Sequence, residues 1–184
     1  MGHKKLILTG GGTAGHVMPH LALLPSLRQD GWQLLYVGSK GVEKELAHKY
    51  GIEFREIACG KLRRYFSWQN FTDIFKIVWG TIQAFFILAR YRPQAVFSKG
   101  GFVSVPVAIA AWILGVPVVT HESDATPGLA NKIITRFSQK ILCAFPDTLK
   151  YLPANKAVLC GIPIRQELLQ GDAQRAFNLW GFFA

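Results

Sequence analysis

Short apolar runs alternate with helical segments along the whole chain, and this alternation limits its possible folds more than any other feature. The runs are rich in branched apolar residues and predict strands; the segments between them repeat their apolar residues at helical spacing. The predicted strands are Lys5–Thr9, Gln33–Val37, Ile52–Ile57, Ala95–Ser98, Val116–Thr120, Lys140–Cys143 and Ala157–Leu159. The predicted helices are Met18–Gln29, Val42–Tyr50, Asn70–Tyr91, Val105–Leu114, Gly128–Phe137 and Asp172–Trp180. This order predicts an α/β fold with a doubly wound, Rossmann-like parallel sheet.

The length of 184 residues suits one domain, because a chain of this size can bury a full core. We expect residues 1–165 to form that domain and residues 166–184 to form a terminal helix and the start of a linker. The most apolar stretch, Phe102–Thr120, is interrupted by Pro106, Gly115 and Pro117. These breaks predict a buried helix and a buried strand in place of a transmembrane helix.

The formal net charge of +10 indicates an acidic partner, such as an anionic lipid or a phosphorylated substrate. No nucleic-acid-binding signature is present, so we expect no nucleic acid partner. The cysteines, Cys59, Cys143 and Cys160, show neither paired spacing nor histidines at ligand spacing. They predict a reduced cytoplasmic protein without a metal site. The N-terminus has no signal-peptide pattern.

Unusual residues gather in three loops, each directly after a predicted strand: Gly10–His16, Lys99–Ser104 and His121–Pro127. Ligands of open parallel sheets bind beyond the carboxyl ends of the strands. We therefore expect the three loops to share one site.

The first loop, Thr9–His16, reads TGGGTAGH. Its glycines let the backbone turn sharply and present N–H groups to an anion at a helix N-terminus. The spacing also fits a dinucleotide-binding oxidoreductase, but that site needs an acid where the second strand ends, and Tyr36–Lys40 supplies none. His16 would lie at the mouth, able to accept a proton from a sugar hydroxyl or to pair with a pyrophosphate. The alternative is a helix-capping or solvent-facing histidine.

The second and third loops add further polar groups. Ser98–Ser104 (SKGGFVS) predicts a second anion cradle facing the first, or simply a tight turn that needs glycine. In the third loop, HESDATPG, a histidine, two acids and hydroxyls follow a buried strand, which predicts a polar cleft. Glu122 would orient a substrate or a neighbouring loop, or act as a base. For Ser123 and Asp124 the alternative is capping of the next helix.

The long helix Asn70–Tyr91 carries apolar residues at helical spacing and follows the basic loop Gly60–Arg64. Some of its face must pack on the sheet, and a merely buried helix is the alternative. Its many aromatic residues, with Arg90 and Arg92 at its end, favour an interfacial helix on anionic lipid. The membrane-binding candidates are Lys61, Arg63, Arg64, Ile74, Trp79, Phe85, Phe86 and Trp112.

Four motifs together resemble the lipid I N-acetylglucosaminyltransferase family of peptidoglycan synthesis. They are Thr9–Pro19 (TGGGTAGHVMP), Ser98–Pro106 (SKGGFVSVP), His121–Lys132 (HESDATPGLANK) and Gly161–Arg165 (GIPIR), in the order of the N-terminal domain of that family. The resemblance implies half of a two-domain GT-B enzyme that uses no metal or other cofactor. Such enzymes transfer GlcNAc from UDP-GlcNAc to the MurNAc 4-hydroxyl of undecaprenyl-linked lipid I, giving lipid II with inversion. They work peripherally, at the cytoplasmic face of the cell membrane, in cell wall synthesis, cell shape and division.

The resemblance also implies roles for individual residues. His16 and Glu122 are the catalytic candidates, with the identity of the general base left open. The substrate-binding candidates are Gly11, Gly12, Thr13, Ala14, Gly15, Gly100, Gly101, Phe102, Ser104, Asp124, Asn131 and Arg165. The acceptor diphosphate would lie between the two glycine loops, and Arg165 would face the cleft. Phe102 stands where some relatives carry tyrosine, and Asp124 where some carry asparagine.

In this family the second domain binds UDP-GlcNAc, and its glycine loop and acid are not among these residues. The resemblance therefore implies that the 184-residue chain alone is inactive. The alternative function is a non-catalytic membrane adaptor for a separate glycosyltransferase subunit.

Overall fold

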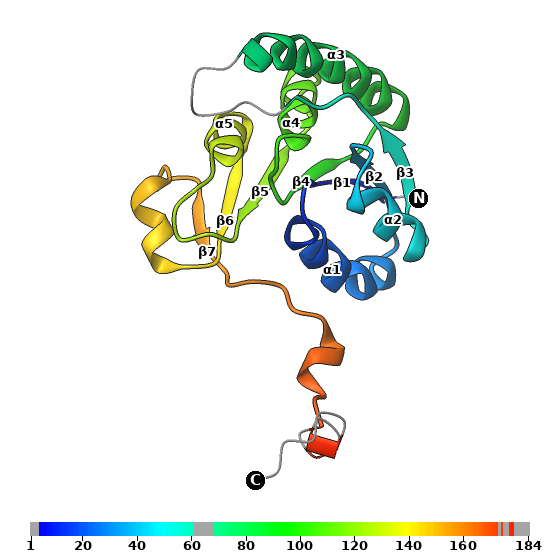
Figure 1. The fold of residues 1–184 in the computed structure, drawn as a ribbon, viewed down its shortest axis with the longest axis vertical. Coiled ribbons are helices and arrows are strands. Elements are labelled where there is room, and N and C mark those ends of the chain that lie inside the picture. The colour runs from blue at the N-terminus through cyan, green and yellow to red at the C-terminus, as the bar shows by residue number, and fades with distance from the viewer. Residues whose placement is uncertain (1–3, 61–67, 173, 175–176, 179–184) are drawn as a thin grey trace.

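The computed structural model describes residues 4–60, 68–172, 174, 177 and 178. Its centre is a parallel sheet of seven strands in the order β3-β2-β1-β4-β5-β6-β7 (Figure 1). The strands are β1 (Lys4–Thr9), β2 (Trp32–Gly38), β3 (Glu53–Glu56), β4 (Ala95–Ser98), β5 (Val118–Glu122), β6 (Lys140–Cys143) and β7 (Ala157–Leu159). The predicted doubly wound, Rossmann-like parallel sheet is confirmed.

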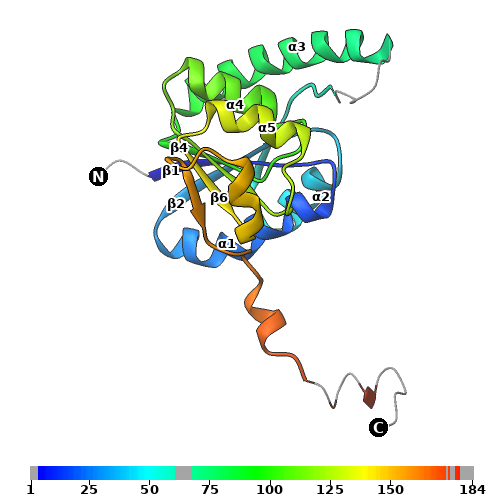
Figure 2. The same cartoon turned by 90° about the vertical axis from the view of Figure 1, so that its left-hand side faces the viewer.

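Helices cover both faces of this sheet (Figure 2). One face carries α1 (Met18–Gln29) and α2 (Val42–Lys49), and the other carries α3 (Trp68–Tyr91), α4 (Ser104–Ile113) and α5 (Leu129–Phe137). Successive side chains of a strand point to opposite faces. Ile7 of β1 accordingly packs in the core beneath α3, α4 and α5, whereas Leu6 and Leu8 join the core beneath α1 and α2.

The chain leaves β1 toward β2 and later returns on the other side of β1 as β4. The carboxyl ends of β1 and β4 therefore flank the point where the winding reverses, which is where open α/β sheets bind ligands. Thr9 and Ser98 lie side by side at this edge, in register. The loops predicted to share a site begin here.

Helix α3 packs mainly along α4, although the sequence predicts packing on the sheet. Ala84 and Leu88 of α3 are buried in the core beside α4. The helix ends at Tyr91; Arg92 has a φ of 53° and Pro93 follows it. The apolar stretch Phe102–Thr120 divides into α4 and the start of β5, as its prolines and glycine predict.

Several predicted boundaries differ from the structure. β5 runs from Val118 to Glu122, two residues later than predicted, because His121 and Glu122 continue the ladder opposite Leu142 and Cys143. Helix α5 is capped by Gly128 without a side-chain hydrogen bond, so the alternative role of Ser123 and Asp124, capping of this helix, does not apply. The sequence does not predict the 3₁₀ helices η1 (Ala14–His16), η2 (Pro146–Tyr151) and η3 (Gln166–Leu169).

After β7 the chain extends away from the sheet through η3, and both views show this (Figures 1 and 2). Most side chains of residues 160–172 are exposed. Most of the predicted helix Asp172–Trp180 falls outside the described residues. The division of the chain at residue 165 stays a prediction.

Candidate functional site

A cavity of about 340 Å³ lies at the carboxyl edge of the sheet. It is formed by the loops that follow β1, β2, β3, β4 and β5. Its lining residues are Gly11, Gly12, Thr13, His16, Ser39, Cys59, Gly101, Phe102, Val103, Asp124, Gly128, Leu129, Ala130 and Asn131. All three predicted loops therefore contribute to one site.

The two glycine loops touch each other across the switch point. A Cβ atom added to Gly101 would lie 3.2 Å from the main-chain nitrogen of Gly11. Gly101 also has a φ of 84° and Gly12 a φ of 87°, a backbone region that favours glycine. The contact and the two dihedral angles together explain why both loops use glycine, and they place two turns of exposed backbone at one cavity.

His16 lies half-buried at the end of η1 and lines the cavity. Its Nδ1 is 3.0 Å from the main-chain oxygen of Lys99, so the first glycine loop is joined to the second by this contact. His16 is thus neither a helix cap nor a free surface residue. The ring is held at the cavity wall, as a proton acceptor requires.

The side chain of Lys99 is buried and does not line the cavity. Its Nζ lies 2.6 Å from Nδ1 of His121 and also contacts the hydroxyl of Ser123. Nε2 of His121 donates to the main-chain oxygen of Gly161 across 2.7 Å. Burial lowers the pKa of the Lys99 ammonium to about 8, against the opposing effect of the Glu122 and Asp124 charges. Lys99 thereby links the second glycine loop to the end of β5 and to the segment after β7.

Glu122 occupies an orienting position in the structure. It is 3% exposed, and its two carboxylate oxygens accept hydrogen bonds from the Asp124 main-chain nitrogen at 2.9 Å and from Asn131 Nδ2 at 2.7 Å. Glu122 does not line the cavity, whereas Asp124 and Asn131 do. The geometry therefore supports the orienting role foreseen for Glu122 and not its role as a catalytic base.

Other candidates also lie away from the cavity. Ser104 is buried and donates its hydroxyl to the Gly100 carbonyl oxygen across 2.8 Å, so it is committed to holding the turn. Arg165 was expected to face the cleft, but it lines a separate hollow beside α1 together with Arg28 and Tyr50. The remaining candidates outside the lining are Ala14, Gly15 and Gly100.

Ser39 and Cys59 line the cavity although no predicted loop contains them, and Glu43 accepts hydrogen bonds from Ser39. No sequence pattern singles out any of the three. Burial, and then the charges of Glu43 and Asp73, raise the pKa of the Cys59 thiol to about 11. Among the residues that the structure describes, no group of three or more metal-ligating side chains could hold a metal ion.

The predicted membrane-binding residues divide into two groups. Ile74, Trp79 and Phe86 of α3 and Trp112 of α4 are between 51% and 67% exposed. Phe85, in contrast, is half-buried and packs against the core. Lys61, Arg63 and Arg64 lie outside the described residues.

By length and composition alone, the part of α3 from Asp73 to Tyr91 is long and apolar enough to cross a membrane. Of its most apolar stretch of 18 residues, 17% is buried inside the protein.

The sheet and the cavity at its switch point place the chain among the Rossmann-like α/β domains that bind ligands at the carboxyl edge. More particularly, the chain belongs to the glycosyltransferase family 28 N-terminal domain family, whose profile matches residues 6–143. The family resemblance predicted from the four motifs is thereby confirmed.

Two curated relatives illustrate the relationship. Over 180 residues the chain is 52% identical to a protein of Clostridium tetani and 55% identical to one of Lachnospira eligens. Both are named UDP-N-acetylglucosamine--N-acetylmuramyl-(pentapeptide) pyrophosphoryl-undecaprenol N-acetylglucosamine transferase. The matches cover 97% of this chain but only 50% and 51% of those proteins. The chain thus spans about half the length of the curated relatives it matches.

Solved structures agree with this placement. The crystal structure of Acinetobacter baumannii MurG is 30% identical, with a TM-score of 0.73, and the match covers 88% of this chain and 46% of that one. The chain therefore corresponds to one half of that enzyme. The UDP-N-acetylglucosamine 2-epimerase of Rickettsia bellii is 17% identical with a TM-score of 0.66, covering 96% of this chain and 52% of that one, and shares the fold alone.

Proposed function

We propose that this chain is the acceptor-binding half of an inverting transferase that moves GlcNAc from UDP-GlcNAc to lipid I, forming lipid II in peptidoglycan synthesis. The observation that carries the proposal is the single cavity that joins His16, both glycine loops and Asp124. Relatives at 52% to 55% identity are named for this transfer. The donor, UDP-GlcNAc, would be bound by the second half that those longer relatives contain.

In this proposal each part of the cavity has its own task. The exposed backbone at Gly12 and Thr13 would hold the acceptor diphosphate, because successive main-chain N–H groups in such turns bind anions. His16 would accept the proton of the acceptor hydroxyl while the hydroxyl oxygen bonds to the anomeric carbon of GlcNAc. The bond from that carbon to UDP breaks at the same time, UDP leaves on the opposite side, and the anomeric configuration inverts. Asp124 and Asn131 would orient the sugar.

The exposed face of α3 supports a peripheral position on the cytoplasmic face of the cell membrane. We call this the α3 face: Ile74, Phe75, Val78, Trp79, Ile82 and Phe86, which are 41% to 67% exposed. The opposite side of the same helix packs on α4. A helix with one side on protein and the other apolar and exposed suits the lipid interface better than a lone span. Lipid I is itself anchored in that interface, so the cavity would meet its acceptor there.

Calorimetry on the 184-residue chain tests this function. We expect binding of a soluble lipid I analogue, negligible binding of UDP-GlcNAc, and no GlcNAc transfer. Joining the chain to the second half of a relative should produce transfer, because the reaction needs donor and acceptor aligned, an arrangement that contributes about 7–11 kcal/mol. Transfer by the chain alone would show that the donor site is misplaced. Membrane binding without affinity for the lipid I analogue would favour the adaptor function.

A further inference from the structure

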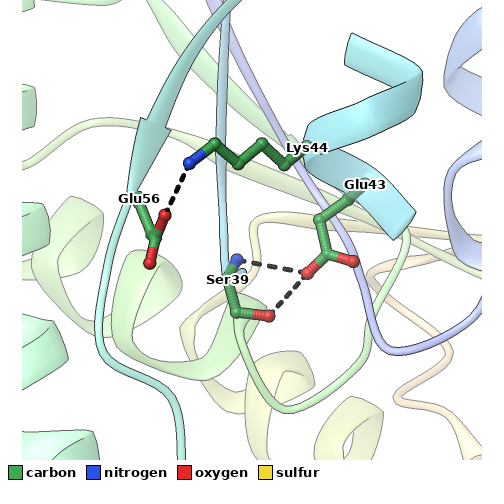
Figure 3. A network of polar contacts seen from close by, with 4 residues as sticks. All are labelled: Ser39, Glu43, Lys44 and Glu56. Carbon is green, nitrogen blue, oxygen red and sulfur yellow. Dashed lines mark hydrogen bonds and ion pairs between the residues drawn. The ribbon is translucent and has the colours of Figure 1, made fainter. Parts of the chain in front are cut away.

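Ser39 and Glu43 form a polar pair at one end of the cavity that the proposed function does not yet use. Ser39 follows β2 and lines the cavity, and Glu43 lies in the first turn of α2. Figure 3 shows the carboxylate of Glu43 turned toward Ser39. The side chain of Glu43 is fully buried, with 0% exposure, which is unusual for a glutamate at a helix start.

One carboxylate oxygen of Glu43 fixes the orientation of Ser39. Oε1 accepts from the Ser39 main-chain nitrogen at 3.1 Å and from the Ser39 hydroxyl at 2.6 Å. A hydroxyl has one proton to donate and two lone pairs with which to accept. Because the Ser39 hydroxyl donates its one hydrogen bond to Glu43, it can offer the cavity only its lone pairs as acceptors. The wall at Ser39 therefore accepts hydrogen bonds and does not donate them.

The second oxygen of Glu43 makes this end of the cavity unfavourable for an anion. Oε2 is buried and has no hydrogen-bond partner in the part of the chain that the structure describes. The neighbouring cation Lys44 pairs with Glu56 at 3.0 Å, pointing away from Glu43 (Figure 3). A buried carboxylate without a cation repels further negative charge at short range.

Three glycines leave the room that this carboxylate needs. A Cβ atom on Gly38 would lie 2.9 Å from Cγ of Glu43, and one on Gly41 would lie 2.8 Å from Oε2. A Cβ atom on Gly11, in the first glycine loop, would clash with Oε1. The carboxylate therefore lies directly under the loop that was expected to hold phosphate.

We propose that Ser39 binds a neutral hydrogen-bond donor of the acceptor sugar, a hydroxyl or an acetamido N–H, and that Glu43 is the positioning residue that makes Ser39 an acceptor. This inference rests on the proposed function and gives the acceptor a direction in the cavity. The sugar lies toward Ser39 and Cys59, and the diphosphate stays at the mouth near Gly12 and Thr13, away from the Glu43 charge.

Two probes separate the sugar contact from the diphosphate contact. One is a short-chain prenyl diphosphate carrying MurNAc, and the other is the same prenyl diphosphate without sugar. Ser39→Ala should weaken binding of the first about tenfold, the loss typical of one buried hydrogen bond, and leave the second unchanged. Ser39→Thr restores a hydroxyl and should recover most of the loss. Ser26→Ala, on the exposed side of α1, serves as the matched control.

Glu43→Gln keeps the shape and the acceptor oxygen but removes the charge. It should strengthen binding of the sugar-free diphosphate several-fold while keeping the melting temperature close to that of the wild type. Repeating the Ser39→Ala comparison on a probe with an N-methylated acetamide identifies the donor. The Ser39 effect disappears if the donor is the amide N–H and persists if it is a hydroxyl, and either result supports the proposal.

Two outcomes would overturn the inference: Ser39→Ala weakening both probes equally or neither, and Glu43→Gln leaving diphosphate binding unchanged or weaker. A wild-type chain that binds the sugar-free probe but gains nothing from the sugar would also overturn it. If the wild-type chain binds neither probe, the proposed function fails, and this inference fails with it. The wild-type titrations therefore distinguish failure of the function from failure of the inference alone.

Discussion

The imidazole of His16 meets the main-chain oxygen of Lys99 through Nδ1, at 3.0 Å. A carbonyl oxygen can only accept, so Nδ1 must carry the proton. The neutral ring then has its lone pair on Nε2, which is the nitrogen free to take a proton from a substrate. The second glycine loop thus fixes the tautomer of a residue in the first, and this relation explains how His16 can serve as a base.

Replacing His16 tests this relation. In a full-length transferase that contains this domain, His16→Asn keeps a donor for the Lys99 oxygen but lacks a basic nitrogen. We expect turnover to fall about 10²–10⁴-fold, the usual contribution of a general base, with little change in KM for the acceptor. His48→Asn, on the exposed side of α2, is the control and should leave turnover intact. Wild-type-like turnover of His16→Asn would exclude His16 as the base.

The fold was predictable because parallel strands buried on both faces read as short apolar runs. The end of β5, which carries a histidine and an acid, was not predictable in this way. His121 and Glu122 look like loop residues in the sequence, yet both are buried in the strand because Lys99, Gly161 and Asn131 satisfy their polar atoms. Such partners come from distant segments, and local sequence patterns do not reveal them.

The same limit applies to the cavity. The glycine loops and His16 carry a local signature, and the structure brings them together. Glu43 carries none, since a glutamate in the first turn of a helix ordinarily faces solvent and stabilises the helix dipole. Only the surrounding glycines, Gly11, Gly38 and Gly41, reveal that its side chain turns inward. Arg165 is the opposite case: its motif predicts a place at the cleft, but the structure places it beside α1. The motif itself carries no information on the direction in which its segment runs.

Cys59 should react slowly with alkylating agents at neutral pH. Burial, with the charges of Glu43 and Asp73, raises its thiol pKa to about 11, and only the thiolate is a good nucleophile. In a Cys160→Ser background, which removes an exposed thiol, iodoacetamide labelling of Cys59 should accelerate about tenfold per pH unit from pH 7 to 9.5. Mass spectrometry of the Cys59 peptide gives the rate. A plateau near pH 9 would contradict the raised pKa.

His20 should make the fold sensitive to acid. It is fully buried, and burial, followed by the charges of Lys99, His121 and His16, lowers its pKa from 6.5 to about 3. Between pH 6.5 and pH 3, His20 binds a proton in the unfolded chain but not in the folded chain. The free energy of unfolding therefore falls as the pH falls from 6.5 toward 3. The loss from this group approaches about 1.4 kcal/mol per pH unit.

Urea unfolding at pH 7, 6 and 5 isolates this contribution when wild type is compared with His20→Gln. The variant should be less stable at pH 7, because His20 packs edge-on against Tyr36 and Phe97, but it should lose less stability on acidification. His48→Gln, with an exposed imidazole, should retain the wild-type pH dependence. Equal slopes for wild type and His20→Gln would show that His20 does titrate in the folded protein.

The α3 face should bind anionic membranes through its aromatic residues. Trp79 and Phe86 are 57% and 67% exposed, so replacing both with serine removes little of the packing on α4. Burying each aromatic side chain in the interface contributes about 1.5–3 kcal/mol, and the double variant should therefore lose about 100-fold or more in partitioning to phosphatidylglycerol vesicles.

The matched control is Leu168→Ser with Leu169→Ser, two residues of η3 that are 61% and 69% exposed but lie away from α3 (Figure 1). Since basic residues near the surface add about 1 kcal/mol each, binding should also weaken with salt and with zwitterionic lipid. Cosedimentation that is indifferent to salt and to both aromatic substitutions would mean that the α3 face packs against protein and not against lipid.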